Sequence, residues 1–269
     1  MLINYKALTT TKFVLLSMLS IVLIGTGNIA HHLFEAFYKQ GITIAQVYGR
    51  NTETLSSFKS KCTTTTDPTK IIDANLYIIA VSDTAIESLS KLISDKKGLV
   101  AHTSGSVPIH ALSPKRKGVL YPLQSFTKEK EIDFSTVPLC IEASHKDDLA
   151  VLKKLANTIS KSVFEVSSIQ RAQIHLAAVF ANNFSNHMYT IANELCEKEG
   201  LPFDLLKPLI MESTAKLQVL KPDKAQTGPA IRNDILTMQS HIDALENPLH
   251  KKIYQLISES IKTKNEEKL

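Results

Sequence analysis

Two of the nine glycines in this 269-residue chain lie two positions apart, at Gly25 and Gly27. They follow an apolar stretch and belong to a G-x-G-x-x-A motif that ends at Ala30. In such a motif the first glycine permits a tight turn, and the second lets the backbone approach a pyrophosphate. The following helix then presents its N-terminus to the phosphates. The motif therefore predicts dinucleotide binding, the alternative being a purely structural turn. The predicted contact residues are Gly25, Thr26, Gly27, Asn28 and Ile29.

The end of the next apolar stretch bears on which dinucleotide is bound. NAD sites usually place an Asp or Glu here, about 20 residues after the glycines, to bind the ribose 2′-hydroxyl. This chain instead continues from Gly49 into Arg50 and Asn51. Because a guanidinium can donate two hydrogen bonds to one phosphate, Arg50 and Asn51 favour the 2′-phosphate of NADP. The alternative, a surface arginine, leaves the missing acid unexplained.

Further polar residues follow the later apolar stretches, where the carboxyl ends of parallel strands would line a cofactor crevice. Val81 and Ser82 end one stretch and are predicted to contact the cofactor. His102 and Ser104 end the next and are expected near the nicotinamide. His102 is either a proton donor or a hydrogen-bonded structural residue. Gln124 lies in a third polar loop and is predicted, like Ser104, to bind substrate.

A segment of the second half, residues 172–193, has a helical pattern without any Lys, Arg, Asp or Glu. Exposed helices of this length normally carry charges, so we expect a central, buried helix. Its apolar stripe comprises Ile169, Leu176, Phe180, Phe184, Met188, Ile191 and Leu195. Its polar stripe comprises Arg171, His175, Asn182, Asn186, Tyr189 and Asn193. Because buried polar groups need partners, the polar stripe is expected to line a cleft or to bind neighbouring helices.

The segment TGPAIRND, residues 227–234, predicts a rigid turn before a helix that Asn233 or Asp234 caps. A guanidinium held on such a turn is well suited to a carboxylate or a phosphate. Arg232 is therefore a candidate substrate-binding residue. The alternative is an internal salt bridge from Arg232 to Asp234 or Glu212.

These residues require a scaffold in which strands alternate with helices. Apolar stretches predict strands at residues 20–25, 43–48, 76–81, 98–103, 118–121 and 137–142. Helical patterns lie at 28–40, 52–60, 84–95 and 146–160. Strands that are apolar on both faces and separated by helices predict a parallel sheet covered on both sides. After a last strand near 163–166 the patterns are helical. The predicted fold class is α/β, a Rossmann-type doubly wound parallel sheet followed by an all-α C-terminal domain.

The predicted domains are an N-terminal extension (1–17), an NADP-binding Rossmann domain (18–166) and a helical substrate and dimerisation domain (167–269). The only strongly apolar run, residues 13–24, is 12 residues long. A bilayer span needs about 20. Lysines precede the run as in a signal peptide, but no small-x-small cleavage site follows it. We therefore interpret its second half as a buried first strand.

The composition excludes several classes of protein. The net charge of +5, from 31 basic and 26 acidic residues, is too mild to favour nucleic-acid binding. The three cysteines are far apart and form no CxxC pair, which argues against a disulfide framework and a metal site. We expect a cytoplasmic protein with a small-molecule substrate and no membrane, nucleic-acid or metal partner.

The motifs GTGNIA, HTSGS, YPLQSF, HLAAVFANNF and TGPAIRND together resemble Rossmann-like oxidoreductases that carry a helical C-terminal domain of unknown function. The chain is more distantly similar to pyrroline-carboxylate reductases, deazaflavin-dependent NADP reductases and the phosphogluconate or hydroxyisobutyrate dehydrogenase group. The resemblance implies an NADP-binding domain followed by a helical domain, like the C-terminal domain of phosphogluconate dehydrogenase. The resemblance also implies that the helical domain completes the active site and often mediates formation of a homodimer.

One departure from the distant group concerns its catalytic lysine, which lies four residues before an asparagine on the first long helix. Counting back from Asn183 gives Val179, so the lysine is absent here. This argues against the alcohol-oxidising mechanism of that group, although Asn183 itself can be carried over. His175, one turn earlier, is a candidate proton donor or substrate ligand.

The leading hypothesis is an NADPH-dependent reductase of a small polar, anionic metabolite bound between the domains. His175 or His102 would supply the proton, because histidine suits proton transfer near neutral pH. Asn182, Asn183 and Ser104 would position the substrate. The second hypothesis is a non-catalytic NADP-binding protein with a regulatory role, which the missing lysine favours. A methyltransferase is disfavoured because of Arg50.

Overall fold

The computed structural model describes residues 19–128 and 130–266. By compactness the chain divides into two units, one ending at Phe180 and the other beginning at Ala181. The predicted N-terminal extension, residues 1–17, lies outside the described residues. The boundary near residue 166 that we expected from the sequence remains a prediction. Each unit is described below by itself.

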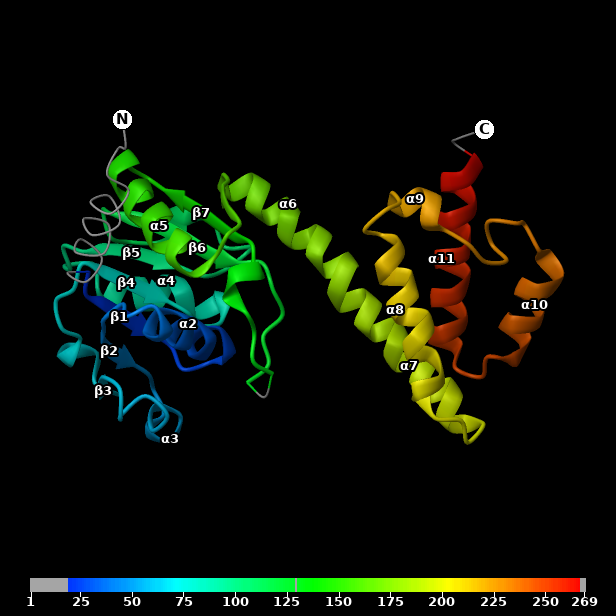
Figure 1. Ribbon diagram of the computed structural model, residues 1–269, viewed down its shortest axis with the longest axis horizontal. Coiled ribbons are helices and arrows are strands. Elements are labelled where there is room, and N and C mark those ends of the chain that lie inside the picture. Colours follow the sequence, from blue (N-terminus) through cyan, green and yellow to red (C-terminus); the bar gives the residue numbers. More distant parts are fainter. Residues whose placement is uncertain (1–18, 129, 267–269) are drawn as a thin grey trace, which may run out of the picture. The chain divides into compact units, whose positions relative to one another are not determined.

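Unit 1 is built on one eight-stranded sheet with the order β3-β2-β1-β4-β5-β6-β7-β8 (Figure 1). The strands are β1 (Ile21–Ile24), β2 (Ile44–Tyr48), β3 (Thr63–Thr65), β4 (Leu76–Ile79), β5 (Leu99–His102), β6 (Lys117–Pro122), β7 (Leu139–Ala143) and β8 (Val163–Glu165). Neighbouring strands run parallel except for the antiparallel pair of β6 and β7. The predicted Rossmann-type sheet is therefore confirmed.

Helices cover both faces of this sheet, as doubly wound folds require. They are α2 (Asn28–Lys39), α3 (Thr52–Leu55), α4 (Asp83–Leu92) and α5 (Lys146–Ile159). Successive strand residues face opposite sides. Leu23 therefore packs in one cluster with Phe34 of α2 and Leu155 of α5. Val22 packs in the other cluster with Ile86 of α4. Short 3₁₀ turns η1 (Pro68–Lys70), η2 (Ile109–Ala111) and η3 (Phe134–Thr136) complete unit 1.

The region after β2 differs from the sequence prediction in two ways. The helix expected over 52–60 ends at Leu55, because the hydroxyls of Ser56 and Ser57 donate to backbone carbonyls three residues earlier. Such local bonds favour turns over a continued helix. The threonine run then forms β3, a short edge strand that apolar patterning did not predict.

The remainder of the described chain is helical, which confirms the predicted all-α C-terminal part. Its elements are α6 (Ser168–Ala178), the π-helical segment η4 (Val179–Phe184), α7 (Ser185–Lys198), η5 (Phe203–Leu206), α8 (Lys207–Lys216), α9 (Pro222–Ala225), α10 (Ile235–Ala244) and α11 (Pro248–Glu266). The boundary between the units falls inside η4. Short π-helical segments are rare in proteins and are frequent at functional sites.

The expectation that residues 172–193 form a buried helix is wrong. Leu176, Phe180 and Phe184 of the apolar stripe are 51%, 63% and 49% exposed. The buried residue of this helix is Arg171, from the polar stripe. A charge-free sequence indicates surroundings that disfavour charge, but it does not say whether the same chain supplies them.

Candidate active site

A cavity of about 950 Å³ lies at the carboxyl ends of β1, β2 and β4 in unit 1. In the sheet, β1 has β2 on one side and β4 on the other, so the order of the strands reverses at β1. Doubly wound sheets bind their ligands at this switch point. The cavity is lined by all nine residues predicted from the sequence to bind the cofactor: Gly25, Thr26, Gly27, Asn28, Ile29, Arg50, Asn51, Val81 and Ser82. Sequence reasoning missed Tyr48, Thr54, Leu89 and Phe126, which also line it.

The two motif glycines serve different needs. Gly25 has a φ of +124°, and a Cβ atom there would lie 2.1 Å from the carbonyl oxygen of Ala80. A Cβ atom on Gly27 would meet nothing within 4 Å, so its backbone faces open space. Gly27 is also the N-cap of α2, whose first turn has no side-chain cap and no acidic residue. The free N–H groups of this turn fit a pyrophosphate.

The far wall of the cavity suits a second phosphate. Arg50 is exposed at the end of β2, and among residues 19–128 and 130–266 no acidic residue lines the cavity. The Asn51 side chain accepts a hydrogen bond from the backbone N–H of Glu53 at 2.7 Å and caps α3. The hydroxyls of Thr26 and Thr54 lie 2.8 Å apart and join the glycine turn to α3. A guanidinium in this position can donate two hydrogen bonds to one phosphate.

The loop after β6 is held against the glycine motif. Asn28 Nδ2 donates to the carbonyl of Phe126, and His32 Nε2 donates to the carbonyl of Thr127, both at 2.8 Å. The rings of His32 and Phe126 also pack, with centroids 5.2 Å apart. This loop brings Gln124, predicted to bind substrate, into the wall of the dinucleotide cavity.

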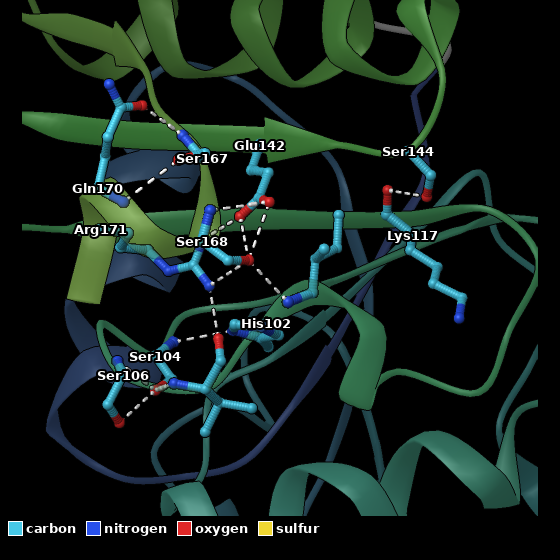
Figure 2. A network of polar contacts seen from close by, with 12 residues as sticks. His102, Ser104, Ser106, Lys117, Glu142, Ser144, Ser167, Ser168, Gln170 and Arg171 are labelled. Carbon is cyan, nitrogen blue, oxygen red and sulfur yellow. Dashed lines mark hydrogen bonds and ion pairs between the residues drawn. The ribbon is translucent and has the colours of Figure 1, made fainter.

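A buried ion pair fixes the start of α6 to the sheet (Figure 2). Arg171 is fully buried, and its guanidinium pairs with Glu142 of β7 and donates to the carbonyl of Val107. The Ser168 hydroxyl donates to both Glu142 oxygens, at 2.9 and 2.8 Å. Arg171, the first member of the polar stripe, therefore has an internal partner.

His102 lies at the end of β5 and is fully buried. Its Nδ1 accepts from the backbone N–H of Ser104 at 3.1 Å, while Nε2 has no hydrogen-bond partner in the described part of the chain. Burial, and then the charge of Arg171, lowers the pKa of His102 to about 4, against the opposing charge of Asp83. The Ser104 hydroxyl accepts from the N–H groups of Ser106 and Val107. Both side chains therefore stabilise their own loop (Figure 2).

His175 lies on α6, one turn after Arg171, and is partly exposed. Its Nδ1 lies 3.2 Å from the hydroxyl of Tyr121, at the end of β6. Sequence reasoning missed Tyr121, although it belongs to the YPLQSF motif. Of the two candidate proton donors, only His175 has a side chain that is accessible to solvent.

The remaining candidate residues, Asn182, Asn183 and Arg232, belong to unit 2. Asn182 and Asn183 are exposed in η4. Arg232 is exposed just before α10, which Asp234 caps through the N–H of Thr237, as the sequence predicted. Over the ranges 19–128 and 130–266, no salt bridge joins Arg232 to Asp234 or Glu212.

The described residues form neither a membrane-spanning helix nor a cluster of metal-ligating side chains. No helix in them is long and apolar enough to cross a membrane. Nor do they contain a cluster of three or more His, Cys, Asp or Glu side chains able to hold a metal ion.

Comparison with known families assigns both parts of the chain. Residues 20–104 match the family described as NADP oxidoreductase, coenzyme F420-dependent, and residues 137–261 match a domain of unknown function, DUF2520. No curated protein matches the chain.

Solved structures resemble the chain over most of its length. A Bacteroides fragilis protein assigned as an NADP oxidoreductase is 42% identical, with a TM-score of 0.87 over 92% of this chain and 99% of that one. A Thermotoga maritima protein (18% identity, TM-score 0.72, 92% and 99% covered) shares the fold. So does a Myxococcus stipitatus imine reductase solved with NADP⁺ (12%, 0.60, 92% and 93%). The chain therefore belongs to the family of Rossmann-fold NADP oxidoreductases that carry a C-terminal DUF2520 domain.

Proposed function

We propose that the protein binds NADP(H) in preference to NAD(H) and reduces a small, polar, anionic metabolite. The observation that carries the proposal is the lining of the 950 Å³ cavity, which in the described part of the chain combines the GTGNIA turn with Arg50 and contains no acidic residue. The first turn of α2 would hold the pyrophosphate, and Arg50 with Asn51 would hold the 2′-phosphate. When bound, NADPH supplies hydride to an electrophilic carbon.

His175 is the proton donor in this proposal, and His102 is a structural residue. The side chain of His102 is fully buried, and its lowered pKa keeps it neutral near pH 7. His175 is partly exposed, and within the described residues its ring has a hydrogen-bond partner at Nδ1 and none at Nε2. Because Val179 replaces the catalytic lysine of the distant dehydrogenase group, a reductase would need a different proton donor, and His175 lies one turn earlier on the helix.

Substrate recognition is assigned to amide, hydroxyl and guanidinium groups. Asn182, Asn183, Gln124 and Ser104 would bind polar groups of the substrate, and Arg232 would bind its anionic group. Replacing Arg232 by lysine keeps the charge but loses the planar fork. The variant should weaken binding of an anionic substrate and leave NADP affinity and thermal stability near wild type. A large loss of stability without ligand would instead indicate a structural arginine.

The proposed assembly is a cytoplasmic homodimer formed mainly through unit 2. This unit exposes large apolar side chains on several helices, among them Leu209, Met211, Val219, Leu236 and Leu256, each 64% or more exposed. Exposed apolar side chains on this scale are typical of association surfaces. Light scattering at micromolar protein should give the mass of a dimer, and a monomer would contradict the proposal.

Calorimetry followed by a turnover assay tests the function. Titration with NADP⁺ and NAD⁺ should show tighter binding of NADP⁺, and equal affinities would contradict the cofactor assignment. NADPH absorbance is then followed with a panel of small carbonyl and imine acids. Oxidation that needs one of them, and that stops in a His175→Gln variant, supports the reductase.

A second candidate function is a non-catalytic NADP-binding protein. The observation that favours it is the valine at position 179, where the distant dehydrogenases have their catalytic lysine. Tight NADP⁺ binding without oxidation of NADPH by any member of the panel would select this alternative.

A further inference from the structure

Three motifs of the sequence meet at the imidazole of His175. Tyr121 comes from YPLQSF, Gly105 from HTSGS, and His175 from the helix that contains HLAAVFANNF. The Tyr121 hydroxyl lies 3.2 Å from His175 Nδ1, and the two rings pack edge to face with centroids 6.0 Å apart. None of these three residues is among the described residues that line the 950 Å³ cavity.

Gly105 allows the two rings to lie this close to the loop. A Cβ atom at position 105 would lie 2.7 Å from His175 Nδ1 and 2.8 Å from the ring of Tyr121. Side-chain carbons essentially never approach ring atoms so closely, so the loop, the ring or α6 would have to move. The backbone of HTSGS therefore forms one wall of a fitted site for the imidazole.

We propose that Tyr121 is a positioning residue. Together with the backbone at Gly105 it holds His175 by Nδ1 and leaves Nε2 as the atom that exchanges a proton with the substrate. This inference rests on the proposed reductase function and adds to it a residue that acts through His175.

The surroundings of α6 make this arrangement rigid. Arg171 and His175 are four residues apart, so they lie on the same face of the helix. The ion pair of Arg171 with Glu142 fixes that face to β7. Between them, Ile174 packs on a buried cluster that contains Tyr121 and Cys140. The imidazole is therefore held through its own helix as well as through its ring.

The site is linked to the dinucleotide cavity through one short loop. Ser106, next to Gly105, donates a hydrogen bond to Asp83 at the first turn of α4. Asp83 follows Ser82, which lines the cavity. The loop that supports His175 is thus attached to the cavity wall, and all of these contacts lie within unit 1.

The phenol of Tyr121 has the chemistry that this role needs. Burial raises the pKa of Tyr121 to about 12, so the phenol keeps its proton near pH 7. When Nδ1 carries a hydrogen, the hydroxyl oxygen accepts a hydrogen bond from Nδ1–H of His175. That bond persists when Nε2 gives its proton to the substrate oxygen or nitrogen, and a proton taken up from solvent then restores the one at Nε2. No proton has to move at Nδ1 during the cycle.

Nuclear magnetic resonance tests the contact without a substrate. Long-range proton–nitrogen spectra of ¹⁵N-histidine protein give the state of both ring nitrogens, and a His175→Gln variant assigns the signals. Tyr121→Phe should shift the Nδ1 resonance of His175, whereas Tyr77→Phe should not. Tyr77 is a matched control, because its buried hydroxyl bonds to backbone groups at 72 and 74, outside the site. An Nδ1 resonance that is unchanged by Tyr121→Phe would overturn the proposal.

Kinetics with a substrate from the panel tests the role. Tyr121→Phe should lower kcat about tenfold with the KM for NADPH unchanged, and His175→Gln should lower it by about 10²–10⁴. In the His175→Gln background, Tyr121→Phe should have no further effect, since Tyr121 acts through His175. Additive losses would overturn the positioning role. A shifted Nδ1 resonance without any turnover would refute the reductase while leaving the contact established.

Discussion

The two units of this chain bury apolar side chains to very different extents. In unit 1 the residues of the central strands are almost all inaccessible, and helices cover both faces of the sheet. Over residues 181–266, by contrast, Ala230 and Met238 are the buried hydrophobic residues, while Leu236 is 85% exposed. Unit 1 therefore contains its own core, whereas unit 2 leaves large apolar side chains exposed on several of its helices.

The largest difference between the units is expected in the unfolding free energy that is lost when an ion pair is broken. Arg171→Met leaves Glu142 nearly buried without its cation, which should lower the free energy of unfolding by about 3–5 kcal/mol. The matched variant in unit 2 is Lys198→Met, whose partner Glu246 is 78% exposed. It should have no measurable effect, because water replaces an exposed partner. Urea unfolding followed by circular dichroism measures both, and similar losses would contradict the comparison.

The second prediction is that unit 1 loses stability in acid, because the imidazole of His102 is buried. His102 has a pKa of about 4 in the folded chain and an ordinary value of 6.5. Between these values the unfolded chain binds a proton that the folded chain does not, so stability falls as the pH is lowered. The loss should reach about 3 kcal/mol by pH 4.

A His102→Gln variant isolates this term, because glutamine does not titrate. The difference in unfolding free energy between wild type and variant should be constant above pH 6.5 and should shift against wild type below it. Urea titrations at a series of pH values measure it. A difference that stays constant down to pH 4 would mean that His102 is solvated in the folded chain.

The third prediction assigns cofactor selection to unit 1 alone. Arg50→Ala should weaken NADP⁺ binding about tenfold to a hundredfold, because a charge-assisted hydrogen bond to the 2′-phosphate is lost. NAD⁺ affinity should not change. Arg232→Ala removes an exposed guanidinium from unit 2 and should leave both affinities unchanged. Calorimetry on the two variants decides, and equal losses would assign part of the NADP site to unit 2.

The sequence predicted the cavity at the strand ends better than it predicted the surroundings of the helices that begin with α6, and the reason is physical. The residues that line the cavity could be recognised from local sequence: the glycine turn, the strand ends and Arg50. In a parallel sheet, residues that follow neighbouring strands meet at one edge, so no distant contact had to be known. Tyr121 was missed because its partner, His175, is 54 residues away. No periodicity reports such a contact.

The helical part shows the opposite limit. A charge-free segment predicts apolar surroundings, yet Leu176 and Phe180 are exposed. Arg171, interpreted as part of a polar stripe, is buried against a carboxylate that only the folded sheet brings to it. Burial of a charge cannot be deduced from helix pattern, because the pattern does not include the partner.

The last prediction concerns exposed leucines, whose replacement should change the free energy of unfolding little. Its effect on association distinguishes the two units. Leu236→Gln should change the stability of the monomer by no more than about 0.5 kcal/mol, since the side chain is already in water. If a second copy covers α10, burying that leucine contributes about 1.5–3 kcal/mol to association, so the variant should raise the dimer dissociation constant at least tenfold. Leu92→Gln, at a 53% exposed leucine of unit 1, is the matched control and should leave the dissociation constant unchanged. Sedimentation equilibrium measures both. A dimer that Leu92→Gln weakens and Leu236→Gln does not would place the association surface on unit 1.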